Sequence, residues 1–136
     1  MKILVDSDAL FALYVATDQH HQQAKQIFQA LLKQKAELFT TNLVLQETVT
    51  VLSYKAGQKP ACDFLQRFAK INIKPMFIGG RLTVQAWKLF KQQKKKGTSF
   101  IDCANVVFCR EMKISMIFSF DKFYFKTGSL KKCTSE

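Results

Sequence analysis

The sequence predicts an α/β protein with a central, mostly parallel sheet of four or five short strands and helices on both faces. Short, almost wholly apolar segments alternate along the chain with longer segments whose apolar residues recur at helical spacing. The apolar segments lack the polar–apolar alternation of a strand with one wet face, so both faces of the sheet are expected to be covered. With 136 residues and neither repeat nor linker, we expect one folded unit over residues 1–136.

The first elements alternate as this class requires. Lys2–Asp6 is a buried strand that ends at an acid, and Ala9–Ala16 is a short apolar helix. Asp18 is the expected N-cap of a longer amphipathic helix. Glu37–Thr41 is the second strand, and Asn42 is the expected cap of the helix that follows it.

Glycine and proline punctuate the middle of the chain. Gly57 suits the C′ position at the end of the helix that Asn42 begins, and Pro60 suits the first turn of the next helix. Asn72–Ile78 is a third strand, which Pro75 places near an edge of the sheet. Gly79-Gly80 then breaks the chain before another amphipathic helix.

The last third of the chain completes the pattern. The helix after the glycine pair is expected to end in the run Lys94-Lys95-Lys96-Gly97. Thr98-Ser99 begins a helix that extends through Met112, and Ser115–Phe120 is the fourth strand. The remainder is short and basic.

Four of the 10 acidic residues stand in otherwise apolar segments, where an ionised carboxylate is costly unless something compensates it. In a parallel sheet, strand ends and the first turns of the following helices meet at the carboxyl edge, where such folds bind ligands. We therefore expect the four at one site, although each alone also has a structural explanation as a cap, a turn residue or a half-buried side chain. They are Asp6, Glu47, Asp102 and Asp121.

Clustered carboxylates repel one another and have raised pKa values unless a cation neutralises them. Oxygen-only ligands favour Mg²⁺ or Mn²⁺, which also accept phosphate oxygens. The chain carries 21 Lys and Arg against 10 Asp and Glu, and this net charge of +11 favours nucleic acid or an acidic membrane surface as partner. An acidic metal pocket in a basic protein suits cleavage of a polyanion. Lys94, Lys95 and Lys96 form a solvated run to which we assign at most a weak RNA contact.

Four stretches, in this order and spacing, resemble the PIN-domain family. They are LVDSDALFAL with Asp6, TTNLVLQETVTVL with Glu47, TSFIDCANV with Asp102, and IFSFDKFYF with Asp121, in which Ser119 stands where the family often has Ser or Thr. The resemblance implies a metal-dependent endoribonuclease with Mg²⁺ or Mn²⁺ on Asp6, Asp102 and Asp121, and with Glu47 as a ligand or bound through water. For a chain of this length it also implies a VapC-type toxin, commonly a homodimer, that is neutralised by a cognate antitoxin.

Further polar residues of the same stretches could support the site. Ser7, Thr98, Ser99 and Asn105 could supply hydrogen bonds, although Thr98 or Ser99 serves equally well as a plain N-cap. Asp8 is an extra acid where many relatives carry Asn. It either joins the site or caps the following helix.

Two alternatives remain at this point. Asp6-Ser7-Asp8 after a strand is similar to the D-x-D motif of haloacid-dehalogenase-type phosphatases, but Leu10 stands where that family usually has Thr or Val. The other alternative is a basic module of the same fold that binds nucleic acid or a protein partner without cleaving RNA. Such a binder of polyanions gains nothing from carboxylates in its groove.

We expect a cytoplasmic protein without a membrane segment. Asp6 and Asp8 interrupt the apolar N-terminus, and no apolar run approaches the roughly 20 residues that cross a bilayer. The four cysteines form no C-x-x-C pair, so we expect them to be reduced and mostly buried, without zinc.

Overall fold

A computed structural model describes residues 1–127 and 130–135 of the chain. In this part, five strands form one sheet in the order β3-β2-β1-β4-β5, and every neighbouring pair is parallel. The strands are β1 (Lys2–Val5), β2 (Glu37–Thr41), β3 (Lys74–Met76), β4 (Met116–Phe118) and β5 (Lys131–Lys132). The predicted α/β class and strand number are confirmed.

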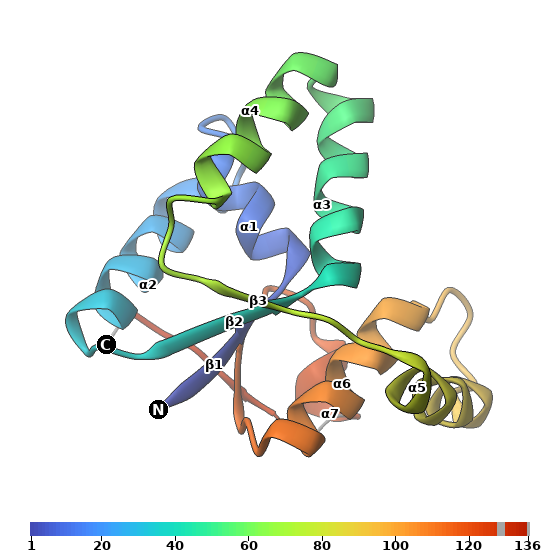
Figure 1. Ribbon diagram of the computed structural model, residues 1–136. Coiled ribbons are helices and arrows are strands. Elements are labelled where there is room, and N and C mark those ends of the chain that lie inside the picture. The colour runs from blue at the N-terminus through green and yellow to red at the C-terminus, as the bar shows by residue number, and fades with distance from the viewer. Residues whose placement is uncertain (128–129, 136) are drawn as a thin grey trace.

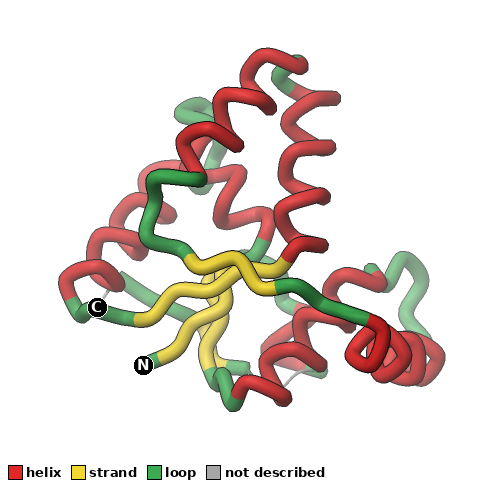
Figure 2. The backbone as a smooth tube through the Cα atoms, viewed as in Figure 1, coloured by secondary structure: helices red, strands yellow, loops and turns green. Residues whose placement is uncertain are grey.

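Helices cover both faces of the sheet, as Figures 1 and 2 show. Ile3, Val5 and Leu38 point into a core with the first four helices, whereas Leu4 and Ile117 point into a second core with the last three. Alternate residues of one strand thus serve opposite cores, which explains why the strands are apolar throughout. The helices are α1 (Ser7–Tyr14), α2 (His21–Lys33), α3 (Asn42–Lys55), α4 (Gln58–Phe68), α5 (Gly80–Gln92), α6 (Phe100–Met112) and α7 (Phe123–Lys126).

The glycine and proline predictions hold. Gly57 follows α3 with φ 116°, a conformation that favours glycine, and its N–H donates to the Leu52 carbonyl at 3.0 Å. Pro60 lies in the first turn of α4. β3, which contains Pro75, is an edge strand, where the missing N–H is tolerated.

Two predicted helix caps are wrong. The N-cap of α2 is His20, and Asp18 lies two residues earlier, where its Oδ2 accepts from the His20 N–H at 2.9 Å. The N-cap of α3 is Thr41, whose hydroxyl accepts from Val44 N at 3.1 Å. The Asn42 side chain instead accepts from Ile78 N at 2.8 Å and fastens the chain after β3.

The end of α5 and the C-terminal segment also differ from expectation. The helix α5 ends at Gln92, so Lys94, Lys95 and Lys96 lie in the loop before α6, not on a helix end. The sequence did not indicate α7 or β5. None of the helices in the described part of the chain is long and apolar enough to cross a membrane.

Candidate metal centre

Asp6 lies at the carboxyl end of β1 and is 3% exposed. Its backbone N–H continues the pairing with β4 by donating to the Phe118 carbonyl at 3.0 Å. Its Oδ1 accepts from Ser7 N at 2.8 Å and so caps α1, and its Oδ2 accepts from the Ser119 hydroxyl at 2.8 Å. Burial raises the pKa of Asp6 to about 6 despite these bonds, and the negative charge of Glu47 adds to the rise.

A chain of buried hydrogen bonds links Asp6 to Asp102 on α6. The Nδ2 of Asn105, which is fully buried, donates to Asp6 Oδ1 at 3.3 Å and to the Tyr124 hydroxyl at 2.9 Å. The Tyr124 hydroxyl donates in turn to Asp102 Oδ1 at 2.8 Å. Burial, followed by the charge of Asp6, raises the pKa of Asp102 to about 7. Burial likewise raises the pKa of Tyr124, which therefore remains a hydrogen-bond donor at neutral pH.

A second chain runs through Ser119, directly after β4. The Ser119 hydroxyl lies 2.8 Å from Asp6 Oδ2 and 3.4 Å from Asp8 Oδ2, and it accepts from Asp121 N at 3.1 Å. Asp8 Oδ2 also accepts from Phe120 N at 3.0 Å, while Asp8 Oδ1 is buried without a partner. Burial, followed by the charge of Asp6, raises the pKa of Asp8 to about 7.

Glu47 and Asp121 complete the acidic set. Glu47 projects from α3, and its Oε1 accepts a short hydrogen bond from the Ser7 hydroxyl. Asp121 caps the turn before α7 through Phe123 N at 2.9 Å, as its structural explanation predicted. Its N–H donates to the Ser119 hydroxyl, which also contacts Asp6 and Asp8, and its charge is among the causes that raise the pKa values of Asp8 and Asp102. All five acids are thus joined through shared partners at the carboxyl edge of the sheet.

Among the residues that the structure describes, no basic side chain forms an ion pair with these acids. In residues 1–127 and 130–135 the ion pairs are Arg67–Asp63 and Arg81–Glu111, and neither involves the acidic set. The carboxylates at the centre therefore stay crowded and partly desolvated, which is why three of their pKa values are raised.

The donor set suits a hard divalent cation. Its groups are carboxylates, hydroxyls and an amide, and the buried oxygens Asp8 Oδ1 and Asn105 Oδ1 have no hydrogen-bond partner. The ligand geometry is not preformed, because no three acidic, histidine or cysteine side chains in the described chain form a ready ligand group. The chemistry of these donors fits Mg²⁺ or Mn²⁺.

The supporting residues divide into two groups. Ser7, Asn105 and Ser119 bond directly to the acids, as described above. Ser99 is the N-cap of α6 and accepts from Asp102 N at 3.4 Å, so it positions Asp102 through the backbone. The structure does not bring Thr98 to the acids, because its hydroxyl donates to the Lys95 carbonyl at 2.8 Å.

Tyr124 is the site residue that the sequence reasoning missed. It is fully buried and joins Asn105 to Asp102. The available signal was a tyrosine within the apolar segment FYF after Asp121, since a buried tyrosine hydroxyl usually finds a polar partner.

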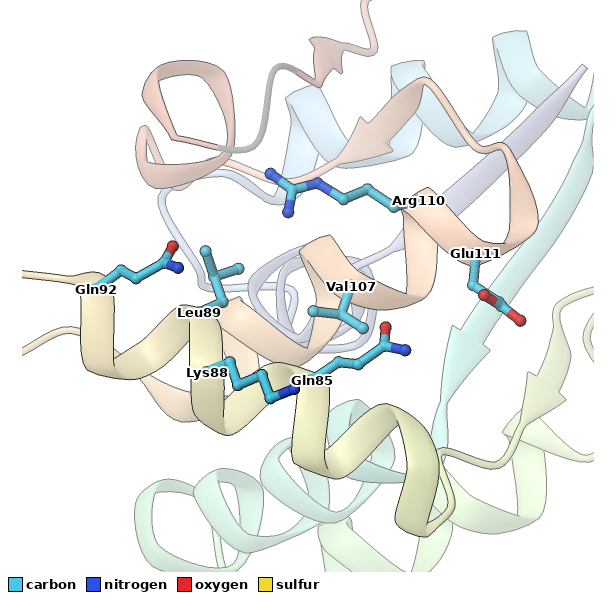
Figure 3. A pocket seen from close by; sticks show the side chains of 7 residues that line it. All are labelled: Gln85, Lys88, Leu89, Gln92, Val107, Arg110 and Glu111. Atoms are coloured by element: carbon cyan, nitrogen blue, oxygen red, sulfur yellow. The ribbon is translucent and has the colours of Figure 1, made fainter.

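A groove of about 330 Å³ between α5 and α6 lies apart from this centre. Figure 3 shows the side chains that line it, which come from α5 (Gln85, Lys88, Leu89 and Gln92) and from α6 (Val107, Arg110 and Glu111). None of the five acids lines the groove, so we do not assign it to the metal centre.

Fold and site together define a small parallel α/β protein with an acidic centre at the carboxyl edge of its sheet. The chain belongs to the PIN-domain family, whose family model matches residues 3–128. This assignment removes the phosphatase alternative that was based on Asp6 and Asp8.

Two VapC proteins are similar to this chain over most of its length. A VapC ribonuclease of Archaeoglobus fulgidus is 31% identical over 120 residues, which cover 86% of this chain and 76% of the relative. The 23S rRNA-specific endonuclease VapC20 of Mycobacterium tuberculosis is 26% identical over 119 residues, 88% of each protein. The crystal structure of VapC20, described as a sarcin–ricin-loop-cleaving toxin, superposes with a TM-score of 0.81 over 93% of this chain and 95% of that chain.

Proposed function

We propose that this protein is a Mg²⁺- or Mn²⁺-dependent endoribonuclease that acts as a VapC-type toxin. The observation that carries the proposal is the set of five acids at the carboxyl edge, three of which, Asp6, Asp8 and Asp102, have pKa values raised by burial and by neighbouring carboxylates. Similarity to two VapC ribonucleases supports RNA as the substrate.

Asp6, Asp102 and Asp121 are the proposed metal ligands, and Glu47 binds directly or through water. When bound, the cation supplies charge neutralisation at the scissile phosphate and activation of water for in-line attack. The chain itself fixes the ligands: Ser119 and Asn105 hold the two oxygens of Asp6, and Tyr124 holds Asp102. Such outer partners orient a ligand and tune its affinity for metal.

The basic exterior supplies the attraction for RNA. The net charge of +11 favours association with a polyanion in general. Lys94, Lys95 and Lys96 are all exposed and lie in the loop that leads into the Ser99 cap of α6, the helix that carries Asp102. This placement supports a contact between the lysine run and the RNA backbone near the acids.

Cleavage assays with a structured RNA test the proposal. The wild-type protein is expected to cut only with Mg²⁺ or Mn²⁺, and EDTA should abolish cleavage. Asp6→Asn, Asp102→Asn and Asp121→Asn should each reduce it severely, and Asp8→Asn should reduce it less. Glu37→Gln is the matched control, because Glu37 is an exposed acid at the opposite end of β2. Equal cleavage by wild type and Asp102→Asn, prepared by the same route, would contradict the proposal.

The remaining rival is a module of the same fold that binds RNA or a partner without cleaving it. Tight RNA binding without cleavage, in either metal, would favour this rival. The uncompensated acids favour the enzyme, because carboxylates in the groove weaken the binding of a polyanion.

We further propose a cognate antitoxin, a homodimer and a cytoplasmic location. Several large apolar side chains are well exposed, as on surfaces that a partner covers, namely Tyr54, Leu65, Phe77 and Trp87. The four cysteines are free, as expected in a reducing compartment. Light scattering of the protein alone and with its antitoxin would measure the two assemblies.

A further inference from the structure

A second cavity adjoins the acidic centre. It has a volume of about 250 Å³ and lies between α1, α3 and the segment before α2. Ser7 and Asp8 line it, and the same two residues bond to Glu47 and to the backbone of Phe120. Whatever occupies this cavity therefore lies directly beside the carboxylates.

One wall of the cavity is the imidazole of His20. This ring stacks on the ring of Phe120, with the centroids 4.3 Å apart and the planes 8° from parallel. His20 is also fixed through its N–H, which donates to Asp18 Oδ2, and Phe120 is fixed through its N–H on Asp8 Oδ2. The wall is thus a pair of stacked rings whose position is fixed by hydrogen bonds, one of them to an acid of the centre.

The other lining residues add a second ring and a cation. Phe11 of α1 contributes the ring, and the Nζ of Lys55 lies 5.5 Å from its centroid. Lys55 is exposed at the end of α3, so its charge is available at the rim. Asp18, before α2, and Thr48 and Val51 of α3 complete the lining.

We propose that this cavity receives one unpaired base of the RNA, that of a nucleotide flanking the scissile phosphate. This inference rests on the proposed ribonuclease function. Aromatic plates with a cation nearby are how proteins hold single-stranded bases, by stacking on the ring and attracting the backbone. A base in a duplex cannot enter such a cavity, so the protein selects RNA in which this nucleotide is splayed out of the helix.

The first test measures binding without cleavage. The probe is a five-nucleotide RNA with 2-aminopurine between two uridines on each side, titrated with protein in EDTA. Binding to wild type should change the 2-aminopurine emission, and His20→Ala should weaken binding about 5- to 100-fold, the range for loss of one base stack. His20→Phe keeps a flat ring and should retain most of the affinity. Phe77→Ala is the control, since it removes an aromatic ring that is 80% exposed and outside the cavity.

The second test uses cleavage in Mn²⁺. An abasic site is moved through each position around the cut in a single-stranded RNA. One flanking position should lower kcat/KM of the wild type about 5- to 100-fold and should have little further effect on His20→Ala, because both changes remove the same contact. Melting of each variant confirms that it is folded.

The outcomes separate the two proposals. Metal-dependent cleavage with equal 2-aminopurine binding by wild type and His20→Ala overturns the base site and leaves the ribonuclease intact. Binding that depends on His20, in a protein that cuts no RNA, retains the base site and overturns the ribonuclease.

Discussion

Asp8 is the acid whose removal should make the metal-free protein more stable. Its pKa is raised from 3.8 to about 7, chiefly by burial and then by the charge of Asp6, and its Oδ1 is buried without a partner. A shift of one pKa unit corresponds to about 1.4 kcal/mol, so full ionisation of Asp8 is unfavourable by at most about 4 kcal/mol. The effect of Asp8→Asn should be smaller than this, because Asp6 and Asp8 titrate together and because Asn also leaves one buried polar group unpaired. We expect Asp8→Asn to raise the free energy of unfolding by about 1–3 kcal/mol at pH 8.

The pH dependence gives the sign of this effect. The folded protein binds more protons than the unfolded chain between about pH 4 and pH 7, so the free energy of unfolding falls as pH rises through this window. Asp8→Asn should therefore be more stable than wild type at pH 8, and this difference in stability should vanish near pH 5, where Asp8 is protonated.

Urea unfolding in EDTA, followed by far-UV circular dichroism, measures the free energy of unfolding of wild type and Asp8→Asn at pH 5 and at pH 8. Glu37→Gln serves as the exposed control and should differ little from wild type at either pH. A loss of more than about 1 kcal/mol by Asp8→Asn at pH 8 would refute the reasoning, because Asp8 would then act mainly as the acceptor for Phe120 N.

Three further predictions concern the same centre and its surroundings. Mn²⁺ should raise the melting temperature of wild type more at pH 8 than at pH 5, because protons compete for the carboxylates, and Asp6→Asn should abolish this rise. Tyr124→Phe should lower stability by about 1–2 kcal/mol, because it removes the hydroxyl that accepts from Asn105 Nδ2 and donates to Asp102 Oδ1, and should weaken Mn²⁺ binding about tenfold in calorimetric titrations. Replacing Lys94, Lys95 and Lys96 by Gln should weaken RNA binding and reduce its dependence on log salt by up to about 2, whereas an unchanged slope would exclude a phosphate contact.

The sequence predicted those parts of the fold that depend on burial of apolar side chains. β1, β2 and β4 are buried on both faces and were found by composition alone, and Pro75 correctly marked an edge. β5 has two residues, both lysine, and α7 has four residues. Elements this short contain only about one period of their own pattern, so no repeat was available to reveal them.

Helix ends were predicted less well, because several polar residues compete for each end. Thr41 and Asn42 are both residue types that cap helices well. Thr41 is the cap because the Asn42 side chain instead accepts from the N–H of Ile78, 36 positions away in the sequence. The helix α5 ends where Gln93 takes an extended backbone conformation, with ψ 142°. A lysine run suits a helix end but does not fix where the helix stops.

The four acids could be chosen from the sequence because each stands among apolar neighbours, and the parallel sheet then brings them to one edge. Their connections could not be predicted in the same way. The bond from Asn105 to Tyr124 and the bond from Ser119 to Asp6 join positions 19 and 113 residues apart, and they depend on how α6, α7 and β4 pack. Whether the acids close into a ligand set remains a prediction.

The electrostatics of this edge bear on the choice between enzyme and binding module. Every acid of the centre accepts a backbone or side-chain hydrogen bond, yet the pKa values of Asp6, Asp8 and Asp102 are still raised. The metal-free fold therefore loses stability by ionising these groups, and neutral residues of the same shape would remove that loss. A cation offsets this loss of stability only where the carboxylates can reach the cation. A polyanion that binds without a cation makes the loss larger. The arrangement is thus useful to a protein that binds metal and RNA together and unfavourable to one that binds RNA alone.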